Sequence, residues 1–138
     1  MLRIVPTLFT SFILGLLLTS QTGCLLAVAA AGTGTTVAYV RGDLETTLDA
    51  DPRAVVDAAD RALKNMEIAV VSKSASALDG SVNGRTARDV KISIVVKAET
   101  QKFSHVSVRV GVFGDNAMQA SILEKIRAEL NEATASSE

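Results

Sequence analysis

The sequence of 138 residues has a single cysteine, a single histidine and almost no excess of either charge. One cysteine excludes a disulfide framework and a cysteine-based metal cluster, and one histidine excludes most zinc and di-metal chemistry. The balance of 14 Lys and Arg against 15 Asp and Glu argues against a strongly basic nucleic-acid binder, so no nucleic-acid partner is expected. With 48% hydrophobic residues, the chain has the composition of one folded domain.

The N-terminus has the pattern of an export signal. An uncharged, mainly apolar run at residues 8–18 follows a single arginine, and a short polar stretch then leads to Gly23 and Cys24. This order of positive charge, apolar run and small residue is typical of a secretory signal. A small residue directly before a cysteine resembles the bacterial lipobox, in which the peptide is cut before an acylated cysteine, although Gln21 stands where leucine is usual. The sequence therefore predicts a signal peptide at 1–23 and lipidation of Cys24.

A transmembrane anchor is the alternative, because residues 4–31 are largely apolar outside the polar stretch 19–22. Four polar residues near the bilayer centre are unfavourable, so cleavage is the favoured interpretation. In both cases the rest of the chain is exported and held at a membrane. Residues 24–36 would form a Gly/Ala-rich tether between the membrane and the folded domain. By resemblance to Gram-negative lipoproteins, Leu25 implies the periplasmic face of the outer membrane.

The remainder predicts a domain at residues 37–132 and a flexible tail at 133–138. Apolar residues that alternate with period two predict strands, and apolar stripes with spacings of three and four predict amphipathic helices. Strands are expected at residues 36–48, 67–74, 81–86, 90–98 and 105–112. Helices are expected between Asp51 and Met66 and between Asp115 and Leu130. The strand at 81–86 has few apolar residues, so Asn83 and Gly84 could form a tight turn instead.

The first helix has a clear start, because Asp51 can cap the first turn and Pro52 lacks the N–H that would be unpaired there. Two ion pairs at i,i+4 spacing are expected on its exposed face, Asp57 with Arg61 and Asp60 with Lys64. In the last helix the residues expected to be exposed are Glu124, Lys125, Arg127 and Glu129.

Two amphipathic helices must cover one face of a sheet, and strict alternation in the last two strands leaves the other face polar. The sequence thus predicts an α+β two-layer sandwich, with a mainly antiparallel sheet of four or five strands and both helices on one face, in the order β-α-β-β-β-β-α. A crossover through the first helix should make the first two strands parallel, with a right-handed connection. The apolar residues expected to face the helices include Val40, Leu44 and Leu48 in the first strand and Val112 at the end of the last.

The polar face of this sheet is the candidate site. Lys91, Ser93, Lys97, His105, Ser107 and Arg109 should point there, and Arg85 and Arg88 could border it. We take Lys91, Lys97, His105 and Arg109 as the candidate partner-binding residues for an anionic partner, such as an envelope protein or cell-wall carboxylates. The alternative is an ordinary solvated face, which antiparallel sheets commonly have.

Catalytic motifs are missing from the sequence. A Ser-His-Asp arrangement would need His105, yet no G-x-S-x-G motif is present, and the acids form no calcium-binding loop. We therefore expect no enzyme activity, no cofactor and no metal. A small-ligand pocket between helix and sheet stays open as an alternative, because Ala58, Ala59 and Ala62 would leave space for it.

Two stretches carry a family resemblance, Tyr39 to Glu45 (YVRGDLE) and Arg109 to Asp115 (RVGVFGD). Together with Gly-Cys after a signal and a final Leu-Glu-Lys-Ile helix, they resemble an uncharacterised bacterial lipoprotein family known as domain of unknown function 3568. The resemblance implies a lipid-anchored envelope protein and no known activity. The sequence therefore predicts a membrane-anchored lipoprotein of the bacterial cell envelope, with a non-catalytic binding or structural domain.

Overall fold

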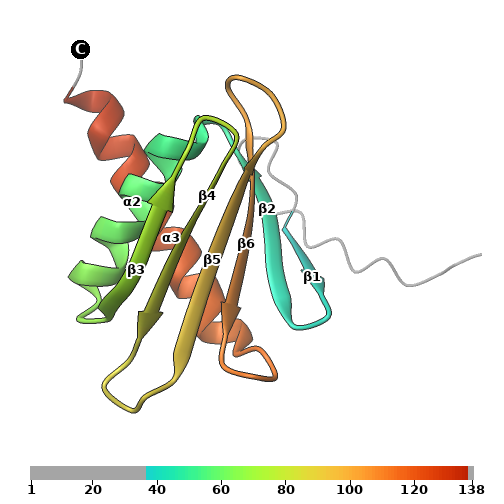
Figure 1. The fold of residues 1–138 in the computed structure, drawn as a ribbon, viewed down its shortest axis with the longest axis vertical. Helices are drawn as coiled ribbons and strands as arrows, with labels where there is room; N and C mark the ends of the chain where they lie inside the picture. The colour runs from blue at the N-terminus through green and yellow to red at the C-terminus, as the bar shows by residue number, and fades with distance from the viewer. Residues whose placement is uncertain (1–36, 137–138) are drawn as a thin grey trace, which may run out of the picture.

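The computed structural model describes residues 37–136, which form one antiparallel sheet with two helices on one of its faces (Figure 1). The strands are β1 (Ala38–Val40), β2 (Asp43–Leu48), β3 (Ala69–Ala75), β4 (Asp79–Arg85), β5 (Lys91–Ala98) and β6 (Ser104–Val110). The helices are α2 (Pro52–Asn65) and α3 (Asn116–Ala135), and α3 runs on into the residues expected to form the tail. The predicted signal peptide, Cys24 and the whole tether at 24–36 lie outside the described residues.

The α+β sandwich is confirmed, but the sheet has six strands in the order β1-β2-β6-β5-β4-β3. The additional strand arises because the segment expected to be one strand folds back as a hairpin at Arg41 and Gly42. Both residues have positive φ, 52° and 88°, which is the backbone of a tight turn whose twist matches the flanking strands. Val40 therefore pairs with Asp43 and lies on the opposite face from Leu44, so the expected shared face of these two residues is wrong.

The uncertain strand is present as β4, which contains Asn83 and Gly84 and pairs with both β3 and β5. Its weak apolar signal has a packing reason. A Cβ atom on Gly80 would lie 2.5 Å from a methyl group of Val56, and one on Gly84 would lie 3.0 Å from a methyl group of Ile68. Glycine at these positions lets α2 and the chain that follows it approach the sheet closely, and the same choice of residue removes the apolar alternation.

The strands that flank α2 do not form a parallel pair. β2 and β3 run in the same direction, but β6, β5 and β4 lie between them, and every neighbouring pair in the described sheet is antiparallel. The crossover through α2 carries the chain to the far edge of the sheet, and three consecutive hairpins then bring β6 back beside β2 (Figure 1). The two strands are therefore parallel in direction, as expected, but they are not neighbours, and local patterning contains no information about this separation.

The core lies between the sheet and the two helices. Its largest fully buried side chains come from every layer, among them Leu44, Leu63, Ile92, Ile94, Ile122 and Ile126. The start of α2 is as expected, because the carboxylate of Asp51 accepts hydrogen bonds from the N–H groups of Arg53 at 2.9 Å and Ala54 at 3.1 Å. The apolar face of α2 is thus directed onto the sheet from its first turns, where Val55 and Val56 are fully buried.

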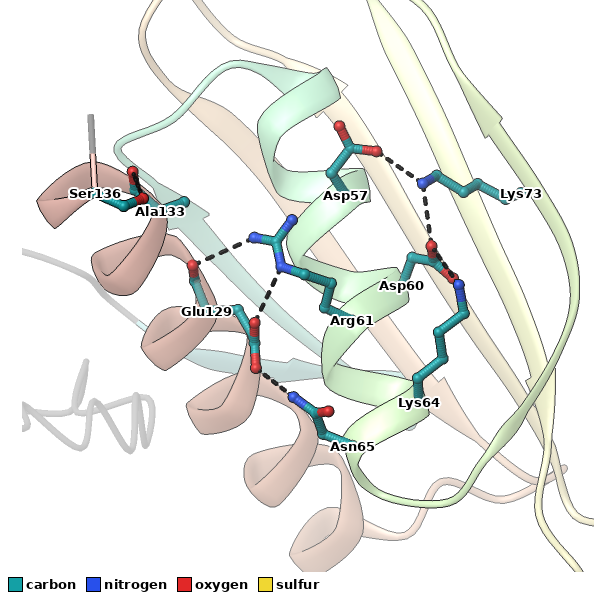
Figure 2. A network of polar contacts seen from close by, with 9 residues as sticks. All are labelled: Asp57, Asp60, Arg61, Lys64, Asn65, Lys73, Glu129, Ala133 and Ser136. Atoms are coloured by element: carbon teal, nitrogen blue, oxygen red, sulfur yellow. Dashed lines mark hydrogen bonds and ion pairs between the residues drawn. The ribbon is translucent and has the colours of Figure 1, made fainter.

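A polar network joins α2 to α3 on one side and to β3 on the other (Figure 2). Glu129 was expected to be exposed, yet only 6% of its surface is accessible, because α2 packs directly beside α3. Arg61 donates from Nε to Glu129 at 3.0 Å, and Asn65 donates to the same carboxylate at 2.6 Å. The expected pair of Asp57 with Arg61 is therefore wrong.

The acids of α2 contact β3 instead. Lys73 of β3 lies 2.7 Å from a carboxylate oxygen of Asp57 and 3.2 Å from one of Asp60 (Figure 2). The expected pair of Asp60 with Lys64 is confirmed at 3.0 Å. Asp60 thus lies between two ammonium groups, which fixes the edge strand β3 to the helix layer.

Candidate functional site

The strand register places the predicted face residues together on the side of the sheet away from the helices. Lys97 is opposite His105, and Ser93 is opposite Arg109 in the pairing of β5 with β6. Small polar side chains continue this surface onto β4, where Ser81 is opposite Val95 and Asn83 is opposite Ser93. The open face is therefore rich in hydroxyl and amide groups.

The open face carries both charges, because β2 lies beside β6. Arg109 forms an ion pair with Asp43, and its guanidinium also donates to the backbone carbonyl oxygen of Arg41 at 3.0 Å. The hydrogen bond to Asp43 raises the pKa of Arg109 above its usual value, against a smaller opposing effect of desolvation. Arg109 thus holds the β1–β2 turn in place, a role that the sequence analysis missed.

His105 lies between two carboxylates of the same face. Its ring nitrogens are 3.8 Å from Glu45 and 3.7 Å from Glu99. The adjacent Ser104 is fully buried on the other face, where its hydroxyl donates to the carbonyl oxygen of Ala50 at 2.6 Å. A serine nucleophile paired with His105 is therefore not formed by Ser104. Within residues 37–136, no group of three His, Cys, Asp or Glu side chains is placed to hold a metal ion.

Lys91 and Lys97 differ from Arg109 in that neither has an acidic partner within 4.0 Å among the described residues. Both side chains are exposed. They are six residues apart on β5, so they are separated by about 20 Å along the strand. Of the four candidate residues, these two are the cations that the fold leaves available.

A second surface feature is the turn between β6 and α3, at residues 111–115. Gly111 and Gly114 have φ values of 69° and 83°, and the N–H of Asp115 closes the turn by donating to the carbonyl oxygen of Val110 at 3.2 Å. Between the two glycines, Val112 is 81% exposed and Phe113 is 93% exposed. The expectation that Val112 continues the buried row of the last strand is wrong, because the strand ends at Val110. The paired glycines are the sequence signal that could have shown this.

This turn is fixed against the β1–β2 hairpin. A Cβ atom on Gly114 would lie 2.3 Å from the carbonyl oxygen of Gly42, so the two backbones are in direct contact. The same carbonyl oxygen accepts a hydrogen bond of 2.6 Å from the side-chain amide of Gln119, which is fully buried at the start of α3. The segments 39–45 and 109–115, far apart in the sequence, therefore form one packed unit at the end of the domain.

Both segments, 39–45 and 109–115, lie within a region that matches a known protein family. The sequence pattern of the proteins of unknown function named DUF3568 matches residues 7–129. The chain belongs to the DUF3568 family. No curated protein matches the sequence. The match covers the unit formed by segments 39–45 and 109–115 as well as both helices, apart from the last residues of α3.

Two grooves lie at opposite ends of the DUF3568 domain. One, of about 490 Å³, lies beside the 111–115 turn and is lined mostly by apolar side chains, including Val90, Val110 and Met118, and by Arg88. The other, of about 620 Å³, lies between the start of α2 and the end of α3, where Asp51, Arg61 and Arg127 line it.

The alanines of α2, expected to leave room for a pocket, line neither groove. Ala58, Ala59 and Ala62 are fully buried in the core of the DUF3568 domain. Their small side chains let α2 pack tightly rather than leaving a cavity beside the helix. No helix within the described part of the chain is long and apolar enough to cross a membrane.

Proposed function

We propose that this protein is a lipid-anchored lipoprotein of the bacterial cell envelope, at the periplasmic face of the outer membrane in a Gram-negative source. The support for its location is Cys24, which follows Gly23 after an apolar run. The family match begins at residue 7 and so includes Gly23 and Cys24. This supports the interpretation that the segment is shared by members of the family. Stable anchoring needs more than one acyl chain, and an acylated lipoprotein cysteine carries several.

The domain then acts as a non-catalytic binding module. The observation that carries this part of the proposal is the open sheet face, where Lys91 and Lys97 are exposed and lack an acidic partner among the described residues. Their separation of about 20 Å fits an extended anion better than a small one. The proposed partner is therefore an acidic envelope protein or a polymer with repeated carboxylates, such as the cell wall.

The location is tested by the intact mass of the protein extracted from membranes. The native chain should have lost residues 1–23 and gained the mass of its acyl chains, and C24S should show neither change. An uncut, unacylated native chain would contradict the lipoprotein proposal. A membrane-embedded protein of uncut mass would favour the N-terminal transmembrane anchor instead.

The binding role is tested with K91Q/K97Q, which removes both available cations and leaves the Arg109 contacts intact. Co-sedimentation with envelope fractions and cross-linking to a defined partner should both fall. The control is K102Q, which removes an exposed lysine from the loop between β5 and β6. Equal binding by the native chain and K91Q/K97Q would contradict the sheet-face proposal and leave the anchoring untouched.

The groove of about 620 Å³ between α2 and α3 favours one alternative role, that of a small-ligand-binding domain. Its lining combines the basic side chain of Arg61 with the apolar side chain of Leu130. A thermal-shift screen of amphiphilic anions and metabolites tests it. A ligand that raises the melting temperature of the native chain, but not of R61Q, would favour this role over the sheet-face one.

A further inference from the structure

The end of the domain that carries Phe113 combines apolar exposure with free positive charge. It consists of the β1–β2 turn (41–42), the β4–β5 loop (86–90) and the β6–α3 turn (111–115), and we call it the Phe113 end (Figure 1). We propose that the Phe113 end lies on an anionic lipid surface, with Val112 and Phe113 among the lipid headgroups. This inference rests on the proposed membrane anchoring and adds an orientation to it.

The exposure of Phe113 is built into the fold. Its turn is closed by the hydrogen bond from Asp115 to Val110, and the backbone of Gly114 is in direct contact with that of Gly42. A fully exposed Phe side chain forgoes about 1.5–3 kcal/mol of burial free energy. Because Val112 and Phe113 border an apolar groove lined by Val90 and Met118, they form part of a continuous apolar surface, which marks a contact site.

The charges around this surface favour an anionic partner. Two of its acids are engaged, since Asp89 forms an ion pair with Arg85 at 2.5 Å and Asp115 caps α3 by accepting from the N–H of Met118 at 3.0 Å. A third, Glu67 in the turn between α2 and β3 at the same end, is exposed. Arg41 and Arg88 are exposed and have no acidic partner among the described residues. Exposed apolar side chains flanked by free arginines are the combination that binds the interface of an anionic bilayer.

The opposite end of the domain differs in charge. Its loops at 49–51, 76–78 and 99–103 carry three acids, Asp49, Asp51 and Glu99, and one basic residue, Lys102. It also exposes an apolar side chain, Leu78, which is 75% accessible. Asp51 caps α2 and Glu99 lies 3.7 Å from His105, so this end differs chiefly in having one lysine where the Phe113 end has two unpaired arginines. Leu78 therefore supplies a matched control for apolar exposure with less positive charge.

The tether permits this orientation. Thirteen residues separate Cys24 from Ala38, the first residue of β1, and the chain between the two can span at most about 50 Å. The longest strand, β5, has eight residues and is about 27 Å long. The tether therefore holds the domain near the bilayer without selecting which end faces it, and the charge and apolar surface of the Phe113 end make that selection.

The absence of tryptophan from the sequence allows a direct experiment. F113W and L78W each introduce one tryptophan at an exposed apolar position, one at each end. The full-length acylated protein is purified from membranes and reconstituted into vesicles of brominated phosphatidylcholine, with or without phosphatidylglycerol. Flotation reports anchoring, and quenching of tryptophan fluorescence by the brominated lipid reports contact with the bilayer.

We expect F113W to float and to lose fluorescence in the anionic vesicles, and L78W to float without that loss. Adding R41N/R88Q to F113W should reduce the quenching to its level in neutral vesicles. Asparagine is chosen at position 41 because it tolerates positive φ.

Three results would overturn parts of the proposal. A floating F113W that is not quenched would overturn the lipid contact alone, and shielding of its tryptophan from acrylamide would then indicate a protein partner or a second copy. Equal quenching in neutral vesicles would overturn the role of charge, and loss of flotation would overturn both the anchoring and the inference.

Discussion

Glu129 of α3 lies beneath Arg61 of α2, and its carboxylate accepts from the arginine Nε at 3.0 Å and from Asn65 at 2.6 Å. The arginine also donates to the backbone carbonyl oxygen of Glu129 at 3.3 Å. One buried acid thus joins the two helices through both its side chain and its backbone. A buried charge is tolerated when it is paired and hydrogen-bonded, and it becomes costly when its partners are removed.

E129A should therefore destabilise the domain, by about 1–2 kcal/mol, because two hydrogen bonds to a charged group are lost and the arginine is only partly shielded from water. The matched control is E124A, one turn earlier on α3, whose carboxylate is exposed and pairs with Arg127 at 2.7 Å. Its effect should stay within about 0.5 kcal/mol. Urea denaturation measures both values, and equal losses would show that the Glu129 contacts contribute little.

Because Gly114 contacts Gly42, adding one methyl group at position 114 should strongly lower the free energy of unfolding. G114A combines positive φ with a Cβ atom 2.3 Å from a backbone oxygen, so it should lower the free energy of unfolding by about 3 kcal/mol or more. G111A shares the positive φ, but its Cβ would meet nothing closer than Val90 at 3.6 Å. Its cost should be about 1 kcal/mol of backbone strain. Equal costs for the two variants would mean that the contact with Gly42 is not the cause.

Asp60 predicts a loss of stability in acid. Burial acts to raise its pKa, but hydrogen bonds from Lys64 and Lys73 outweigh this effect, and the pKa of Asp60 lies below its ordinary value. A carboxyl group with a lowered pKa in the folded state contributes stability that is present above the unfolded-state pKa, about 3.9, and is lost as the pH falls. The urea midpoint of the native chain should therefore decrease as the pH is lowered below about 4, and the midpoint of D60N should decrease less.

D57N is the control for this measurement, because Asp57 contacts the same Lys73 at 2.7 Å from a more exposed position. It should retain most of the acid dependence of the native chain. An acid dependence that is the same in D60N as in the native chain would assign the effect to other carboxylates.

Lys73 predicts the corresponding behaviour in base. Hydrogen bonds to Asp57 and then to Asp60 raise its pKa, against the opposing effect of desolvation. An amine with a raised pKa contributes stability that is fully present below the unfolded-state pKa, about 10.4, and is lost as the pH rises through the folded-state pKa. The native chain should lose more stability than K73M between about pH 10 and 12, measured by thermal unfolding. Parallel curves for the two proteins would contradict this assignment.

The three candidate cations of the open face should not behave alike. R109Q should lower the urea midpoint, because it releases Asp43 and the carbonyl oxygen of Arg41 that fix the β1–β2 turn. K91Q should leave the midpoint unchanged, since no acid contacts Lys91 among the described residues. If R109Q were as stable as K91Q, then Arg109 would belong with the available cations and not with the turn.

How far the sequence predicted the fold depended on the range of the interactions. The Asp51–Pro52 start of α2 and the alternation of β5 and β6 arise from residues close together in the chain, and these elements were predicted well. The β1–β2 hairpin was missed because Arg41 is not a typical residue for a position with positive φ. β4 gave a weak signal because two of its residues facing the helix layer, Gly80 and Gly84, are glycines. The basic and hydroxyl residues of the open face were predicted from alternation alone. Which acids lie beside them depends on which strands become neighbours, and alternation does not show this.

The sequence by itself determined the composition of the layers, because the spacing of apolar residues decides which face of each strand and helix leaves water. It also contains the local pattern around Cys24 on which the prediction of an export signal rests. Only the tertiary structure decided that β6 returns to β2, which places Asp43 against Arg109, and that α2 lies beside α3, which buries Glu129. Both depend on contacts between residues more than 60 positions apart, and such pairings are selected by the packing of the whole core rather than by local preference.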